Sequence, residues 1–303
     1  MRKPCLLSVL LGPLLFGAPP LAGQQIAALE TELRSRIARD TALVAVAYYD
    51  PVTRDTLLIE GLTRFHAAST MKVPVLIELG RRIESGELRW SDTLPVRNRF
   101  HSIVDGSEFH LDPADDSDAT LYAREGRGVA IAELARLMIA RSSNLATNLL
   151  IERLDPIRVN GTAHTLGADS IAVLRGVEDG KAYALGRNNT TTARDLARLL
   201  DAIARGRAAG PATTAVLLEL LLAQEFNAGI PAGLPPGVRV AHKTGEITGI
   251  THDAAIVYPA ARGPYVLVVL TRGFADRREA ERLMAELSGI VYRWATRRPD
   301  PRE

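Results

Sequence analysis

Cysteine is almost missing from this chain. Its one cysteine, Cys5, lies near the N-terminus of the 303-residue sequence. The rest of the chain can therefore form no disulfide, and it offers no thiolate as a metal ligand or as a nucleophile. A protein without thiols fits an oxidising compartment such as a periplasm.

Long hydrophobic runs are missing as well, except at the start. Residues 1–23 contain basic Arg2 and Lys3, a mostly apolar run over residues 6–16, and small residues up to Gly23. This order is typical of a cleavable signal peptide, and the run is short for a membrane-spanning anchor, which is the alternative. We expect cleavage near residue 23, a secreted or periplasmic protein, and no stable insertion into a membrane.

The sequence also lacks an excess of either charge, because 37 Lys and Arg residues nearly balance 35 Asp and Glu residues. This balance gives no reason to expect a nucleic-acid partner. The six histidines follow no zinc-binding pattern, and no phosphate-loop motif occurs. We therefore expect no metal, no cofactor, and a monomer that binds a small molecule. Four acidic residues are predicted to form a solvated loop rather than a calcium site: Asp112, Asp115, Asp116 and Asp118.

The hydrophobic patterns predict an α/β fold of the α+β type. Strands are predicted near both ends of the chain, at residues 43–49, 56–59, 238–242, 254–258 and 265–271. Helices are predicted at residues 24–40, 129–139, 145–154, 193–204, 213–224 and 277–294. We expect one antiparallel five-stranded sheet flanked by helices. Residues 24–65 and 226–303 would form this sheet lobe, and residues 66–225 an all-helical lobe beside it.

Lysine is rare, and one lysine follows a serine at helical spacing. Ser69 and Lys72 lie three residues apart at the start of an apolar helix, where Pro74 is tolerated. A serine hydroxyl becomes a nucleophile when a neighbouring base takes its proton, and a desolvated lysine can be that base. The helix start also offers backbone N–H groups to an oxyanion. The alternative is a serine helix cap followed by a surface lysine.

Two further motifs carry residues suited to acyl transfer. Lys243, Thr244 and Gly245 are expected at the end of a strand, where the first two would bind a substrate carboxylate. Gly245 would let the substrate backbone approach closely, and the backbone N–H of Glu246 would join that of Ser69 in binding the oxyanion. A lysine and a turn glycine at a strand end are the ordinary alternative.

The third motif, Ser142 to Asn144, lies between two predicted helices. In its ordinary interpretation it only caps the second helix. In the functional interpretation, Ser142 relays a proton to the leaving nitrogen and Asn144 hydrogen-bonds the substrate.

Together the three motifs, S-x-x-K, S-x-N and K-T-G in this order, resemble those of the penicillin-recognising serine hydrolases, which include β-lactamases and penicillin-binding proteins. Residues 241–245 and 251–257 also read like family motifs, and the resemblance is greatest to class A β-lactamases. It covers nearly the whole mature chain. It implies an acyl-enzyme on Ser69 and hydrolysis of a β-lactam amide. Ser143 departs from the common family form, which has aspartate there.

The resemblance also implies a glutamate that activates water to release the acyl group. Glu178 is the candidate at the matching spacing, and Asp179 is a competing assignment. The family pattern Glu-x-x-Leu-Asn fails here, because Ala182 stands in place of the asparagine. Asn189 stands where the family often has an aspartate, and residues 97–127 form a longer segment than usual.

Slow deacylation would make the chain a D-alanyl-D-alanine carboxypeptidase or a related esterase acting on an acyl-D-Ala-D-Ala-like substrate. The same motifs would also be compatible with a non-catalytic penicillin-binding sensor domain, or with a helical scaffold in which they occur by accident.

Overall fold

A five-stranded antiparallel sheet forms the centre of the molecule. The computed structural model describes residues 22–260 and 262–297, so nearly all of the expected signal peptide lies outside the described residues. The strand order is β2-β1-β11-β10-β9. The bounds are Leu43–Tyr49 for β1, Thr56–Ile59 for β2, Arg239–Ile247 for β9, Ile250–Tyr258 for β10 and Tyr265–Arg272 for β11. The prediction of one sheet built from both ends of the chain is confirmed.

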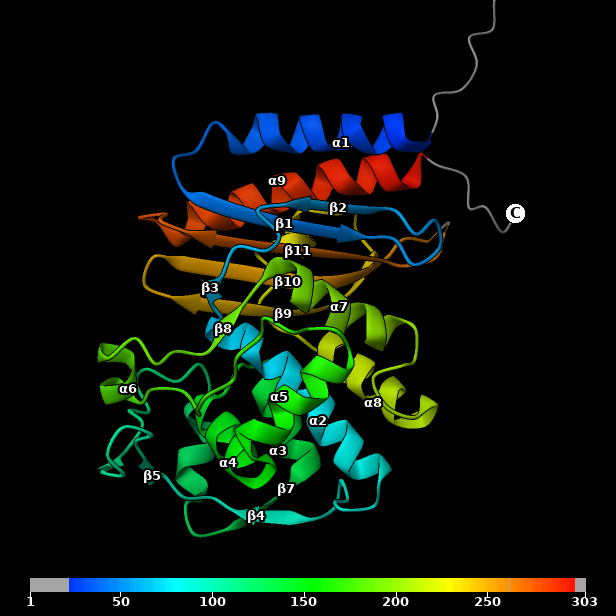
Figure 1. The fold of residues 1–303 in the computed structure, drawn as a ribbon. Coiled ribbons are helices and arrows are strands. Elements are labelled where there is room, and N and C mark those ends of the chain that lie inside the picture. Colours follow the sequence, from blue (N-terminus) through cyan, green and yellow to red (C-terminus); the bar gives the residue numbers. More distant parts are fainter. Residues whose placement is uncertain (1–21, 261, 298–303) are drawn as a thin grey trace, which may run out of the picture.

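Helices cover both faces of this sheet (Figure 1). Helices α1 (Ala22–Ile37) and α9 (Arg277–Thr296) lie side by side on one face, and α7 (Ala193–Ala204) and α8 (Pro211–Leu222) lie on the other side. Successive residues of a strand point to opposite faces. Accordingly Val44, Val46 and Tyr48 of β1 belong to the apolar core under α1 and α9, whereas Ala45 and Ala47 belong to the core on the opposite face.

The remaining helices pack beyond α7 and α8. They are α2 (Lys72–Glu84), α3 (Ile131–Ala140), α4 (Asn144–Leu154), α5 (Pro156–Thr165) and α6 (Gly180–Ala184), with 3-10 turns η1 (Ala68–Met71) and η2 (Ala119–Arg124), whereas the 3-10 turn η3 (Ile230–Gly233) packs against α9. Three short strand pairs join them: β3 (Phe65–His66) with β8 (Thr190–Thr191), β4 (Thr93–Pro95) with β7 (Gly128–Ala130), and β5 (Phe100–His101) with β6 (Glu108–Phe109). None of the helices in the described ranges is both long and apolar enough to span a membrane.

One boundary prediction that matters for the site is wrong. Lys243, Thr244 and Gly245 do not end a strand, because β9 continues to Ile247. The reason is the tight turn that follows: Ile247 pairs with Ile250, so the ladder between β9 and β10 runs on past the motif. The motif therefore lies inside an edge strand that is paired along its length on one side only.

Candidate active site

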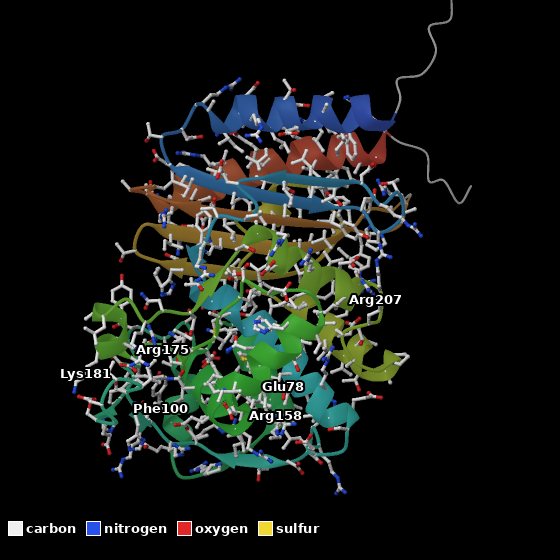
Figure 2. The ribbon with its side chains drawn as sticks, viewed as in Figure 1. Glu78, Phe100, Arg158, Arg175, Lys181 and Arg207 are labelled. Carbon is white, nitrogen blue, oxygen red and sulfur yellow. The ribbon has the colours of Figure 1, made fainter. Side chains whose placement is uncertain are left out.

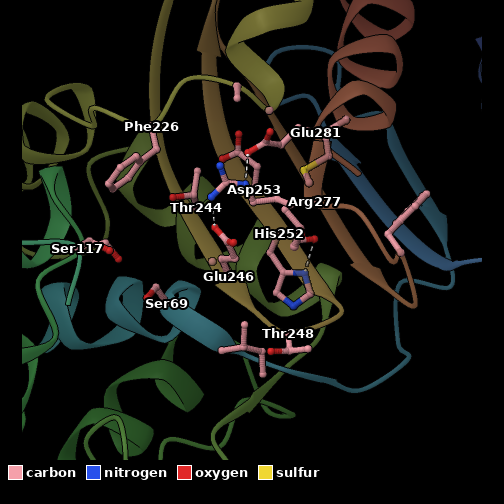
Figure 3. A pocket seen from close by; sticks show the side chains of 18 of the residues that line it. Ser69, Ser117, Phe226, Thr244, Glu246, Thr248, His252, Asp253, Arg277 and Glu281 are labelled. Atoms are coloured by element: carbon pink, nitrogen blue, oxygen red, sulfur yellow. Dashed lines mark hydrogen bonds and ion pairs between the residues drawn. The ribbon is translucent and has the colours of Figure 1, made fainter. Parts of the chain in front are cut away.

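Ser69 lies where η1 leads into α2, at the edge of a cleft of about 890 Å³. The following turn of α2 is buried, which fixes the helix start against the core. Ser69 itself is half-exposed. The cleft is also lined by Ser142, Asn144 and residues 244–249, so the three sequence motifs meet in one place. Figure 3 shows Ser69, Thr244 and Glu246 around it.

Lys72 is fully buried and points at the Ser142 loop. Its Nζ lies 2.5 Å from the Ser142 carbonyl oxygen, 3.1 Å from Ser142 Oγ and 3.0 Å from Asn144 Oδ1. Three acceptors match the three N–H donors of an ammonium group. The side chain of Lys72 thus connects the first motif to the second, through Ser142 and Asn144.

Lys243 is the second buried lysine at this point, and its Nζ donates to Ser142 Oγ at 3.0 Å. It also donates to the Thr244 carbonyl at 2.9 Å. The Ser142 hydroxyl therefore lies between two lysine side chains that come from α2 and β9. On the neighbouring strand β10, Asp253 is buried and bonds His242 at 2.9 Å, which places a negative charge behind Lys243.

Burial alters the protonation of both lysines. Desolvation lowers the pKa of Lys72 from 10.5 to about 7, although the carboxylates of Asp116 and Glu178 act in the opposite direction. Desolvation also holds the pKa of Lys243 well below 10.5, helped by the charge of Lys72 and opposed by Asp253. Near neutral pH, Lys72 can therefore exist as a neutral amine, which is the form that accepts a proton.

The strand motif lies directly against the backbone of Ser69. A Cβ added to Gly245 would come within 3.0 Å of the Thr70 nitrogen and 3.1 Å of the Ser69 nitrogen, so glycine allows this close approach without a shift of the backbone. The Glu246 side chain pairs instead with Arg277 at 2.8 Å, and both line the cleft (Figure 3). The expectation that the backbone N–H groups of Ser69 and Glu246 bind an oxyanion stays a prediction.

Glu178 and Asp179 have clearly different surroundings. Asn144 Nδ2 donates to Glu178 Oε1 at 2.6 Å, so Asn144 links Glu178 to Lys72. Burial of the carboxyl group and the neighbouring carboxylates of Asp116 and Asp115 raise the pKa of Glu178, against the Asn144 hydrogen bond.

Asp179 is turned away from these groups. It is buried, caps α6 through the Ala182 N–H, and accepts from Ser102 Oγ and the Ile103 N–H. These hydrogen bonds lower its pKa despite burial. The geometry favours Glu178 over Asp179 as the group that could activate water.

Three residues around the cleft have left-handed backbone conformations that are uncommon for their type. The φ angles are +45° at Ala68, +60° at Ser142 and +63° at Glu178. Such conformations cost free energy and persist where the surroundings enforce them, often at functional sites. Each residue adjoins or belongs to one of the groups described above.

Known proteins resemble this chain over most of its length. The model of the Beta-lactamase enzyme family matches residues 28–295. The chain belongs to this family. A β-lactamase from Citrobacter koseri is 27% identical over 282 residues, which cover 91% of this chain and 88% of the relative.

Solved structures of β-lactamases agree with this membership. A β-lactamase from Sphaerobacter thermophilus superimposes with a TM-score of 0.77 at 25% identity, covering 90% of this chain and 98% of that one. An ancestral (GNCA) class A β-lactamase gives a TM-score of 0.76 at 27% identity, covering 88% and 99%. The fold is thus that of the class A β-lactamase superfamily.

In this β-lactamase family member, the segment that carries Glu178 is braced from two sides. Asn148 of α4 donates to the Val177 carbonyl at 3.1 Å and accepts from the Val177 N–H at 2.7 Å. Asn189 is buried and accepts from the N–H groups of Leu174 and Arg175. Figure 2 labels Arg175 and Lys181 on this segment. Asn189 therefore ties the segment to β8, and an amide suffices for that role.

The prediction of a solvated acidic loop at residues 112–118 is wrong for two of its four members. Asp118 is buried, caps η2 and pairs with Arg141 at 3.4 Å. Asp116 is half-buried and accepts hydrogen bonds from the start of α4. Asp116 is thus held by N–H groups distant in sequence, and Asp118 by Thr120 and Arg141, partners that acidic composition alone does not reveal.

Sequence reasoning missed several residues that line the cleft. His252 is buried, where desolvation lowers its pKa to about 4, and its ring nitrogens lie 2.9 Å from the His66 carbonyl oxygen and 3.1 Å from the Thr271 nitrogen. Phe226 forms an exposed aromatic part of the wall. The position of His252 inside the family-like stretch 251–257 was a usable signal, whereas Phe226 follows no motif.

Proposed function

We propose that this chain is a serine β-lactamase of the class A type, which hydrolyses the β-lactam amide through an acyl-enzyme on Ser69. The observation that carries the proposal is the Ser142 hydroxyl, which receives hydrogen bonds from Lys72 and Lys243 in the cleft that Ser69 lines. A hydroxyl between two amines can pass a proton from one to a substrate atom beside the other.

Acylation begins when neutral Lys72 takes the proton of Ser69, or when Glu178 does so through a water molecule. The Ser69 oxygen attacks the lactam carbonyl carbon, and the backbone N–H groups of Ser69 and Glu246 stabilise the oxyanion. When the carbon–nitrogen bond breaks, Ser142 gives its proton to the nitrogen and recovers one from Lys72. If Glu178 took the proton of Ser69, it then passes that proton to Lys72 and is again a carboxylate. Lys243 and Thr244 bind the substrate carboxylate, and Asn144 hydrogen-bonds the substrate amide.

Deacylation requires a second proton transfer. Glu178 takes a proton from water, the water oxygen attacks the ester carbonyl, and the bond to the Ser69 oxygen breaks. The proton then returns to Ser69. The raised pKa of Glu178 brings this base closer to neutral pH, where it releases and accepts protons most effectively.

Turnover of a chromogenic cephalosporin tests the proposal. We expect wild-type protein to open the ring and Ser69→Ala to lose at least about 10³-fold in kcat/KM. Ser85→Ala, at the opposite end of α2, is the matched control and should retain wild-type turnover. Equal turnover by Ser69→Ala and the wild type would rule out the nucleophile and with it the proposed mechanism.

A penicilloyl-enzyme that hydrolyses slowly would instead indicate a D-alanyl-D-alanine carboxypeptidase or a related esterase. One observation favours this second candidate: among the described residues, Asn144 is the one side-chain donor to the Glu178 carboxylate, and Ala182 offers none. Intact mass measured over time with penicillin distinguishes the two. An adduct that clears within seconds supports the β-lactamase, and one that persists for hours supports the peptidase.

A further inference from the structure

The carboxylate of Asp116 lies at the start of α4, immediately beside the loop that carries Ser142 and Asn144. Its oxygens accept from the Asn144 N–H at 2.9 and 3.0 Å and from the Leu145 N–H at 2.9 Å. The Tyr122 hydroxyl donates to it at 2.9 Å, and the Ser143 hydroxyl lies 3.5 Å away. Asp116 thus accepts hydrogen bonds from N–H groups that have no partner within the helix at a helix start.

The Asp116 carboxylate has no ion-pair partner in the part of the chain that the structure describes. Within residues 22–260 and 262–297, no lysine, arginine or histidine reaches Asp116 at ion-pair distance, whereas nearby Asp118 pairs with Arg141. The charge of Asp116 therefore acts on the groups of the cleft. It raises the pKa of Lys72, because a negative charge favours the ammonium form, and it raises the pKa of Glu178, because like charges repel.

Asp116 is also connected to Lys72 and Glu178 through the hydrogen bonds of Asn144. The Asn144 backbone is held by Asp116, while its side chain accepts from Lys72 at 3.0 Å and donates to Glu178 at 2.6 Å. Ser142, two residues earlier, keeps a left-handed backbone conformation that costs free energy. Fixing the helix start fixes the geometry of both side chains.

We propose that Asp116, supplied by the segment 97–127, is a positioning residue for both steps of the reaction. Its carboxylate holds the Ser142–Asn144 loop in place and supplies the negative charge beside Lys72 and Glu178. The helix start itself carries a serine, Ser143, whose hydroxyl caps α4 through the Ala146 N–H and brings no charge. The remote segment is therefore part of the active site. This inference rests on the proposed function.

The charged neighbours of Lys72 are Lys243 from β9, Glu178 and Asp116, and those of Glu178 are Lys72, Asp115 and Asp116. Removing the Asp116 charge by Asp116→Asn lowers the pKa of both Lys72 and Glu178. We expect the acid limbs of acylation and of deacylation to move to lower pH by roughly 0.5–1 unit. Asp155→Asn is the matched control, because the Asp155 carboxylate also accepts from an N–H at a helix start, that of Ile157 in α5, and does not act on Lys72 or Glu178.

NMR of protein labelled with ¹³Cε-lysine reads the pKa of Lys72 without any need for catalysis. The labelling is practical because the sequence contains four lysines. A pKa of Lys72 that falls in Asp116→Asn but not in Asp155→Asn supports the inference, even if the wild type proves unable to open β-lactams. An unchanged pKa of Lys72 with a lowered melting temperature would make Asp116 a helix cap only and overturn it.

A rescue experiment tests the position of the charge. Ser143→Asp puts a carboxylate at the helix start itself. Beside Asp116 it should lower the melting temperature, because two carboxylates then adjoin. Asp116→Ala should slow acylation by penicillin. In this Asp116→Ala background, Ser143→Asp should raise the melting temperature and increase the acylation rate roughly tenfold. A Ser143→Asp effect with the same sign in both backgrounds would contradict the proposed role of Asp116.

Discussion

The buried amine of Lys72 is expected to make the stability of the fold depend on pH. Its pKa falls from 10.5 to about 7 in the folded protein. The unfolded chain therefore binds more protons than the folded one between these values, and the free energy of unfolding rises with pH across that window. Replacing Lys72 by methionine, which has a similar length and no charge, removes this dependence.

The magnitude follows from the size of the shift. A group with these two pKa values contributes about 2 kcal/mol more to stability at pH 9 than at pH 7. From pH 7 to pH 9, the free energy of unfolding of the wild type should therefore rise by about 2 kcal/mol relative to that of Lys72→Met. Loss of Lys72 also relieves the repulsion on Lys243, which enlarges the difference in the same direction.

Urea unfolding followed by circular dichroism at pH 7, 8 and 9 measures this difference. Lys181→Met is the control, because Lys181 is 55% exposed and its surface ion pair with Asp105 is worth below about 1 kcal/mol. A constant difference between the wild type and Lys72→Met at the three pH values would refute the reasoning, because it would mean that Lys72 keeps its ordinary pKa.

Three further changes have outcomes that the structure predicts. Glu178→Gln should trap a penicilloyl adduct visible by intact mass, and wild-type deacylation should have an acid limb above the ordinary range of a glutamate, because the pKa of Glu178 is raised; release at the wild-type rate would exclude Glu178 as the base. Gly245→Ala should lower the acylation rate at least about tenfold and destabilise by roughly 1–3 kcal/mol, because the new Cβ meets the Ser69 and Thr70 nitrogens; rapid-mixing kinetics and urea unfolding check both, and unchanged values would mean that the strand adapts. Asn148→Ala leaves both backbone groups of Val177 without their partner, so we expect a loss of about 1–3 kcal/mol together with slower deacylation; a loss of stability with unaltered deacylation would separate this brace from the position of Glu178.

The sequence predicted the bounds of those helices and strands that a local hydrophobic pattern determines. The strand Leu43–Tyr49 and the helix Ala193–Ala204 occur with the predicted bounds, because each is a long apolar pattern with clear ends. The serine–lysine spacing placed Ser69 and Lys72 at one helix start for the same reason. The short strand pairs were missed, because two or three residues carry no periodicity that distinguishes them from loops.

Contacts between distant segments could not be predicted in this way. The end of the strand that carries Lys243 was placed too early, because Gly245 resembles a strand-end glycine, whereas the strand turns only after Ile247. The distinction between Glu178 and Asp179 depends on Ser102 and Ile103, which lie more than 70 residues earlier. Asp116 belongs to no motif, so its hold on Asn144 emerges only in the folded chain.

Stability and reactivity oppose each other at Lys72. The desolvation that makes its ammonium form costly also lowers its pKa to about 7, which makes the neutral base available. Its acceptors all belong to residues 142–144, so the same loop stabilises the charged form and, in the proposed mechanism, receives the proton that the charged form gives up. A substitution that relieves the desolvation must therefore remove the base as well. For this reason Lys72→Met should compare more favourably with the wild type in stability at pH 7 than at pH 9 and, at the same time, should acylate much more slowly, since Glu178 is then the one remaining base of the proposed mechanism.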